Sequence, residues 1–167
     1  GRRVADNAAV QMNLGAYSRL YEGENIRLQA GAKLNYQAFD ENQSHFALGH
    51  GGYFSPQSFI SLALPVNLRW EEGDWSLLAE IAPGYQTYKL DQADVYPTDP
   101  AAQGQLLAQK LLNDDVRAYF ESESHSGFAF SAGLELWRRL GATQVGGEAR
   151  MNTFGNYDEY RMTLKLK

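Results

Sequence analysis

The sequence predicts an all-β protein, an antiparallel up-and-down transmembrane β-barrel with about eight strands. Three observations predict this class. Apolar and polar residues alternate along most of the chain, several alternating segments are longer than strands of soluble domains, and short glycine-containing turns separate them. A chain of 167 residues suits one domain, so we expect residues 1–167 to form a single barrel domain.

The clearest strand pattern covers residues 26–38. Alternate positions from Ile26 to Ala38 are all apolar, and the positions between them are polar or glycine. A helix would spread these apolar residues over all of its faces, so the pattern indicates a strand. Thirteen residues exceed the usual length of about 5–6 in soluble domains. They suit a tilted strand that crosses a bilayer, which needs about 9–11 residues.

The same alternation recurs along the chain. It predicts further strands over residues 8–20, 59–70, 75–89, 127–137, 142–152 and 158–166, and a weaker strand over residues 44–52. Hairpin turns are indicated by the glycine-containing segments 21–24, 71–74 and 155–157. Consecutive hairpins predict an antiparallel meander.

Residues 90–125 interrupt the alternation. Two prolines and several aspartates break the strand pattern, and residues 101–112 predict a short helix with Asp99 as a candidate N-cap. Membrane barrels place long loops outside the cell and short turns in the periplasm. If the last strand ends in the periplasm, the outer connections are those near 21–24, 53–58, 90–125 and 153–157, and the inner ones are those near 39–44, 71–74 and 138–142.

Composition excludes several classes of function. The net charge of −5 argues against a general nucleic-acid binder, and the absence of cysteine excludes thiolate chemistry. No run of about 18 apolar residues exists, which excludes a transmembrane helix. His45, His50 and His125 have no spacing typical of a metal site, so we expect no metal and no cofactor.

An enzyme is not expected either, although two alternatives stay open. His125 with Ser126, and His50 with Ser55, are the nearby pairs from which an outer-membrane lipid hydrolase could be built. Neither pair has an obvious carboxylate or amide to orient the histidine. The other alternative is a soluble, lipocalin-like ligand-binding barrel, because alternation does not say which face meets lipid.

Residues 49–57 read Gly-His-Gly-Gly-Tyr-Phe-Ser-Pro-Gln, and this stretch resembles the GxGGYxSPQ segment of the BcsC family, the outer-membrane exporters of bacterial cellulose synthase systems. Val4-Ala5-Asp6-Asn7 and Pro65-Val66 are also similar to that family, and the resemblance covers essentially the whole chain. It implies a bacterial outer-membrane barrel that follows periplasmic tetratricopeptide repeats and serves an inner-membrane synthase. The family's barrel has about twice the strands predicted here, so we expect the C-terminal half of a larger barrel.

The resemblance implies passive export of a neutral exopolysaccharide, with cellulose as the expected polymer, through a polar lumen in contact with the glucan chain. If the polar faces line this lumen, its charges are mixed, which suits an uncharged glucan. The candidate lining residues are Arg27, Lys33, Arg69, Glu80, Glu135, Glu148 and Arg150. Near the pore mouth, Tyr53 and Phe54 are candidates for stacking against sugar rings. The chain ends Leu164-Lys165-Leu166-Lys167 rather than in an aromatic residue, so we expect a trimmed end or an atypical insertion signal.

Overall fold

The computed structural model describes residues 4–167, and most of its regular structure is one large antiparallel sheet. The expected all-β class is confirmed. The strands of this sheet are β1 (Ala9–Glu22), β2 (Ile26–Phe39), β3 (Ser58–Ala63), β4 (Val66–Glu72), β5 (Trp75–Leu90), β8 (Glu123–Leu140), β9 (Thr143–Asn152) and β10 (Glu159–Leu166). A small ribbon pairs β6 (Ala93–Asp94) with β7 (Tyr119–Phe120), and the helix α1 spans Pro100–Leu112.

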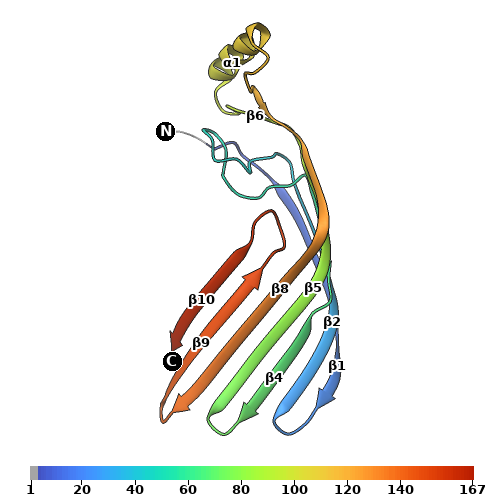
Figure 1. Cartoon of the computed structure of the whole chain (residues 1–167), viewed down its shortest axis with the longest axis vertical. Coiled ribbons are helices and arrows are strands. Elements are labelled where there is room, and N and C mark those ends of the chain that lie inside the picture. The colour runs from blue at the N-terminus through green and yellow to red at the C-terminus, as the bar shows by residue number, and fades with distance from the viewer. Residues whose placement is uncertain (1–3) are drawn as a thin grey trace. The chain divides into compact units, whose positions relative to one another are not determined.

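The large sheet is an antiparallel meander, in which β3 and β4 together occupy one strand position. Its hydrogen-bonded order is β1-β2-β3-β5-β8-β9-β10, and β4 pairs with the same two neighbours as β3 (Figure 1). β3 and β4 therefore act as one strand that is broken at Leu64 and Pro65. Pro65 has no backbone N–H to give to a ladder, which explains the break. Strands β1 and β10 are the two edges of the described sheet.

The tight turns and the long connections lie at opposite ends of the strands. β1–β2, β4–β5 and β8–β9 are joined by hairpins of two or three residues. Gly73 and Gly141 in these hairpins have φ of 56° and 64°, a region that favours glycine. The long connections are residues 40–57, 91–122 and 153–158.

This arrangement corrects two expectations. Residues 44–52 form bends and turns instead of the predicted weak strand. Gly49 and Gly52 adopt positive φ of 93° and 68°, which a regular strand does not accommodate. With that strand removed, the turn at 21–24 moves to the same end as 71–74 and 138–142, so its predicted position among the outer connections was wrong. All three long connections now share one end.

The helix agrees closely with its prediction. Asp99 is the N-cap, and its side chain accepts a hydrogen bond from the backbone N–H of Ala102. Pro100 occupies the first turn, where its missing N–H has no helical partner to lose. Within residues 4–167, no helix is long and apolar enough to cross a membrane.

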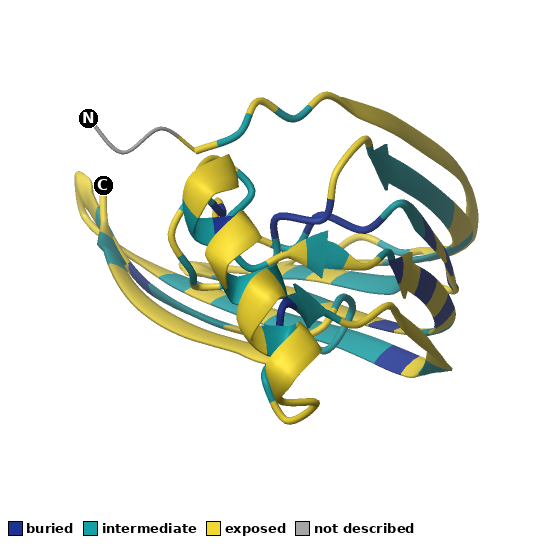
Figure 2. Ribbon diagram, turned by 90° about the horizontal axis from the view of Figure 1, so that it is seen from above, coloured by how far each residue is buried: buried dark blue, intermediate teal, exposed yellow. Residues whose placement is uncertain are grey.

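The chain forms two compact units. Among the described residues, the first contains residues 4–12, 36–60 and 87–126, and the second contains residues 13–35, 61–86 and 127–167. A small aromatic core lies in the first unit, where Phe54 packs edge-on against Phe59 and Tyr88 and Leu90 is also buried. Buried residues occupy alternate positions along β3 and the end of β5, visible as dark blue bands in Figure 2.

Candidate functional site

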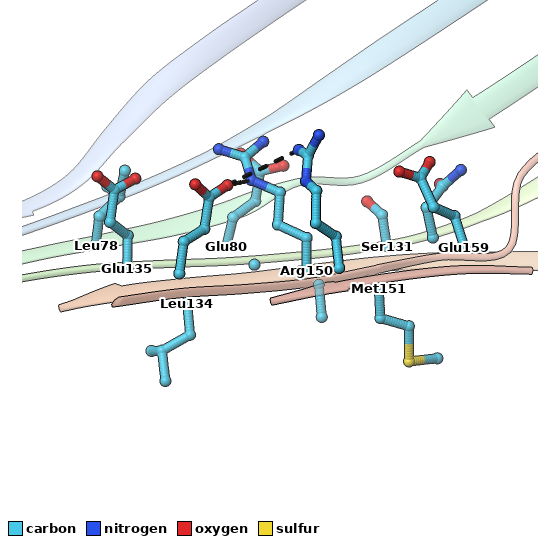
Figure 3. Close-up of a pocket in the computed structure, with 13 residues that line it drawn as sticks. Leu78, Glu80, Ser131, Leu134, Glu135, Arg150, Met151 and Glu159 are labelled. Carbon is cyan, nitrogen blue, oxygen red and sulfur yellow. Dashed lines mark hydrogen bonds and ion pairs between the residues drawn. The ribbon is translucent and has the colours of Figure 1, made fainter. Parts of the chain in front are cut away.

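In the second unit the two faces of the sheet differ sharply in chemistry. The strand register places apolar residues opposite each other on one face, as in Leu134, Ala149 and Met162 on β8, β9 and β10. Most of the charged residues lie on the other face, including Glu135, Glu148 and Arg161. In Figure 3, Glu80, Glu135 and Arg150 project from one side of the sheet, and Leu134 and Met151 project from the opposite side. We refer to these as the polar face and the apolar face.

Glu148 on β9 is the centre of the densest charge cluster on the polar face. Its side chain is only 8% exposed and contacts three cations from two strands. Arg150 bonds to it directly, Lys165 Nζ lies 2.5 Å from Glu148 Oε2, and Arg161 lies 3.9 Å from Glu148 Oε1. One carboxylate thus neutralises part of the charge on three side chains.

Register brings like charges directly opposite one another in this cluster. Glu135 pairs with Glu148 across β8 and β9, and Arg150 pairs with Arg161 across β9 and β10. Like charges opposite each other on a sheet destabilise it unless opposite charges separate them. Lys165 provides that separation for the two glutamates, because its Nζ also lies 3.3 Å from Glu135 Oε1.

The same arrangement recurs on β2 and β4. Arg27 lies directly opposite Arg69, and each arginine is bound by a carboxylate from a hairpin end. Arg27 donates to Glu22 Oε1 at 2.7 Å, and Arg69 donates to Glu71 Oε1 at 2.6 Å. The polar face therefore carries many charges that are largely paired locally. Such a face is hydrophilic without having a strong field of one sign.

A hollow of about 290 Å³ lies over the polar face (Figure 3). Carboxylates, guanidinium groups, a hydroxyl and an amide surround it, contributed mainly by β8, β9 and β10. Glu80 from β5 also lines it and lies opposite Asn67 of β4. The residues that line the hollow offer many weak hydrogen-bonding partners and include no histidine beside the serine hydroxyl. This set suits contact with a hydroxyl-rich molecule.

Trp137 adds an aromatic surface to the same face near the tight turns. It lies directly opposite Gly146 on β9, and a Cβ on Gly146 would come within 2.5 Å of the indole ring. The ring therefore covers the glycine backbone, a known way to stabilise glycine in a sheet. Its Nε1–H donates to Glu135 Oε1 at 2.6 Å, and Lys167 Nζ lies 4.8 Å from the ring centroid.

Six of the predicted lining residues lie on this polar face, and they are Arg27, Arg69, Glu80, Glu135, Glu148 and Arg150. Lys33 has the same alternation in β2 as Arg27 and is exposed, and none of the ion pairs above includes it. The sequence candidates omitted Glu22, Trp137, Arg161 and Lys165. Alternation placed Arg161 and Lys165 on the polar side of their strand, so this signal was sufficient to include them.

Tyr53 and Phe54 lie in the loop of the first unit and have structural contacts. Phe54 packs in the aromatic core, as described above. The Tyr53 ring lies 5.6 Å from the ring of Phe39, and its hydroxyl accepts from Asn7 Nδ2 at 3.1 Å. Gly51 permits this position, since a Cβ there would come within 2.2 Å of the Tyr53 ring.

The two serine–histidine pairs are not arranged as nucleophile and base. Ser126 Oγ donates to Thr87 Oγ1 at 2.8 Å, and the His125 ring lies beside Tyr88. Ser55 is fully buried and accepts from the backbone N–H of Gln43, whereas His50 Nε2 contacts the carbonyl oxygen of Asp94. In the part of the chain that the structure describes, no hydrogen bond joins either serine to its histidine.

These features define an all-β protein built on a meander with one paired-charge face and one apolar face. The chain belongs to the family described as Cellulose synthase operon protein C C-terminus, whose model matches residues 1–167. This agrees with the resemblance carried by residues 49–57.

Curated relatives give the same family. The chain is 31% identical to Cellulose synthase operon protein C of Xanthomonas axonopodis pv. citri over its whole length, which is 12% of that protein. It is 29% identical to the protein of the same name from Pseudomonas fluorescens, again over the whole chain and 12% of the relative. For the Escherichia coli protein the identity is 27% over 89% of the chain. The chain thus spans about an eighth of the length of these relatives.

Proposed function

We propose that the chain is part of a bacterial outer-membrane barrel through which a neutral exopolysaccharide, cellulose, leaves the cell. The polar face lines a hydrated path for the glucan, and an inner-membrane synthase pushes the chain along it. The protein performs no chemistry. The observation that carries the proposal is the division of one sheet into a paired-charge face and an exposed apolar face, in a member of the Cellulose synthase operon protein C family.

The polar face suits an uncharged polymer better than a charged one. A wall for an anionic polysaccharide would be expected to carry excess cations, because steering of a charged ligand relies on a field of one sign. Here the arginines and lysines of the β8–β10 cluster share carboxylates. A sliding glucan needs wetting and weak contacts, which paired charges and amides supply.

The apolar face supports a position in lipid. Membrane barrels direct an apolar band outward and polar residues inward. Large apolar side chains at least half exposed lie on alternate positions of several strands, including Val10, Leu14, Leu62, Ile81, Phe128, Leu134, Met162 and Leu164. A soluble protein rarely exposes a contiguous apolar surface of this extent.

We propose further that strands outside this chain complete the barrel. β1 and β10 are edges, and every residue of β1 is exposed. Open edges do not occur in the hydrocarbon region of a membrane, because their backbone groups would have no partners. The relatives are about eight times longer than the chain, which leaves room for these strands and for periplasmic tetratricopeptide repeats.

Two adjacent positions on β8 allow a direct test. Gly133 is on the polar face opposite Arg150, and Ala132 is on the apolar face opposite Met151. A Cβ at Gly133 meets only Arg150 Cγ, at 3.9 Å, so a cysteine fits there. The chain itself contains no cysteine, so each substitution creates one defined thiol in this region.

Full-length protein with Gly133→Cys or Ala132→Cys would be expressed in a cellulose-secreting bacterium whose own copy is deleted. We expect a bulky, water-soluble maleimide to label Gly133→Cys and to reduce cellulose secretion. Ala132→Cys should remain unlabelled and secrete normally. If the maleimide labelled Ala132→Cys and left Gly133→Cys unlabelled, the apolar face would be the water-exposed one, and the proposed assignment of the two faces would be wrong. Normal secretion from fully labelled Gly133→Cys would contradict a lumen role for this face.

A further inference from the structure

The loop between β2 and β3 forms a second hollow, separate from the polar face. It has a volume of about 580 Å³ and is lined by residues 45–48 and 50–52 together with Val95 and Tyr96. All of these residues belong to the first unit. No aspartate, glutamate, lysine or arginine is among them. The hollow is therefore formally neutral at pH 7, with aromatic, aliphatic and imidazole groups and glycine backbone on its walls.

Phe46 is the most exposed part of this hollow. It is 96% exposed, and Leu48 beside it is 52% exposed. The Phe46 ring lies beside Gly52, because a Cβ there would lie 3.0 Å from two of its ring carbons. Gly52 has φ of 68°, so glycine is favoured there for its conformation as well. The loop thus presents a large aromatic side chain to solvent beside the hollow.

His50 gives the hollow a polar wall with an unused acceptor. The residue is 93% buried, and its Nε2 lies 2.8 Å from the carbonyl oxygen of Asp94. A carbonyl only accepts, so Nε2 carries a proton, and in the neutral imidazole Nδ1 is then an acceptor. Nδ1 is buried and has no hydrogen-bond partner in the structure. A hydroxyl is the kind of donor that this nitrogen lacks.

The sequence candidates for glycan contact in this loop were Tyr53 and Phe54, and the side chains of both already have partners in the first unit, although Tyr53 is 40% exposed. Phe54 belongs to the aromatic core, and the Tyr53 hydroxyl contacts Asn7 and Gln43. Phe46 makes neither kind of contact and faces solvent. A glucose ring has apolar C–H faces and hydroxyl edges. An exposed aromatic face beside a neutral hollow with a buried acceptor matches both features.

We propose that the hollow around Phe46 is a contact site for the exported β-glucan, with a sugar ring on Phe46 and hydroxyl groups toward His50. This proposal rests on the export function proposed above. The loop joins strands at the end that carries all the long connections. Long loops lie outside the cell in membrane barrels, so the site contacts the polymer as it leaves.

The test places a reporter beside the hollow in full-length protein purified in detergent. Leu48→Cys is labelled with an environment-sensitive fluorophore, and cellohexaose is titrated as the probe. We expect a saturable fluorescence change in this background. Phe46→Ala should require about fivefold more cellohexaose for half of the change, as expected for loss of one aromatic contact. Phe46→Trp should keep the response.

Tyr157→Ala is the matched control, because Tyr157 is a 65% exposed aromatic residue in another long connection and does not line the hollow. It should leave the response unchanged. The inference is overturned if Phe46→Ala responds like its parent, or if the labelled parent shows no response while its cellulose secretion is normal. Normal secretion from fully labelled Gly133→Cys would instead count against the export function, so the two failures are distinguishable.

Discussion

At the residue scale, the polar face shows which features alternation can predict and which it cannot. Alternation assigned Arg27, Glu135 and Arg150 to the polar side of their strands correctly, because side-chain direction depends only on strand position. It could not predict that Glu148 binds Lys165, seventeen residues away. That pairing depends on the register between β9 and β10. Register also decides that Glu135 and Glu148 lie opposite each other and need a cation between them.

Gly146 and Gly147 provide a residue-scale prediction about Trp137. A Cβ at Gly146 would lie 2.5 Å from the indole ring and 2.8 Å from the backbone oxygen of Leu136. The oxygen of Leu136 belongs to the backbone of the neighbouring strand, and moving it would disturb the strand pairing. We therefore expect Gly146→Ala to lower the free energy of unfolding by about 1–3 kcal/mol. At Gly147 a Cβ meets nothing closer than 3.9 Å. We expect Gly147→Ala to change stability by no more than about 0.5 kcal/mol.

Urea unfolding of the full-length protein in phospholipid vesicles, followed by indole fluorescence, measures both variants. The two substitutions are adjacent and chemically identical, so differences in strand propensity largely cancel. Equal effects at the two positions would show that the Trp137 ring does not rest on Gly146 in the membrane.

At the element scale, the strands were predicted well and the loop between β2 and β3 was not. Apolar and polar residues alternate over many positions in each strand, so a single residue that breaks the alternation does not hide the pattern. The segment 44–52 contains Gly49, Gly51 and Gly52, which permit backbone conformations outside the strand region. Its conformation depends on distant partners, such as the carbonyl oxygen of Asp94, which lies 2.8 Å from His50 Nε2. The error also placed the turn at 21–24 at the wrong end of the strands. Successive connections lie at alternate ends, so one extra strand moves every connection before it to the opposite end.

This loop should lose stability as pH falls, because of His45. The ring is stacked on Phe120 at 3.7 Å and lies 5.3 Å from the ring of His50. Burial and the nearby His50 lower the pKa of His45, and Glu123 opposes this effect. The folded loop therefore binds the proton less tightly than the open loop. Stability is complete above the ordinary histidine pKa of about 6.5 and falls as pH decreases toward the lower folded pKa.

Amide hydrogen exchange of residues 40–57 at pH 7.5 and 5.5, corrected for intrinsic rates, measures this effect. We expect faster loop opening at pH 5.5 by less than about tenfold, because solvent screens a ring that is only partly buried. His45→Phe keeps an aromatic stack on Phe120 without a titrating group, so its opening should depend less on pH. An equal pH dependence in His45→Phe would assign the effect to another group.

At the scale of the whole molecule, the described sheet has two chemically different faces and two open edges. Both the paired-charge face and the apolar face are present on β8, β9 and β10. The edges are incomplete, since β1 and β10 each have one hydrogen-bonded neighbour in the described sheet. Sequence could predict the faces from alternation. It could not show whether β1 meets β10, because closure depends on the number and stagger of all strands in the barrel.

Amide exchange of the edge strands tests the proposal that strands outside this chain pair with β1 and β10. An antiparallel edge strand directs alternate N–H groups away from its single partner, so in residues 1–167 alone in detergent we expect alternate amides of β1 and β10 to exchange rapidly. In the full-length protein all amides of both strands should be protected, because a second neighbour binds the remaining half. The central strand β5 is the internal control and should be protected in both samples. Full protection of β1 and β10 in a monomeric sample of residues 1–167 would show that this chain closes on itself, and would contradict the proposal that outside strands complete the barrel.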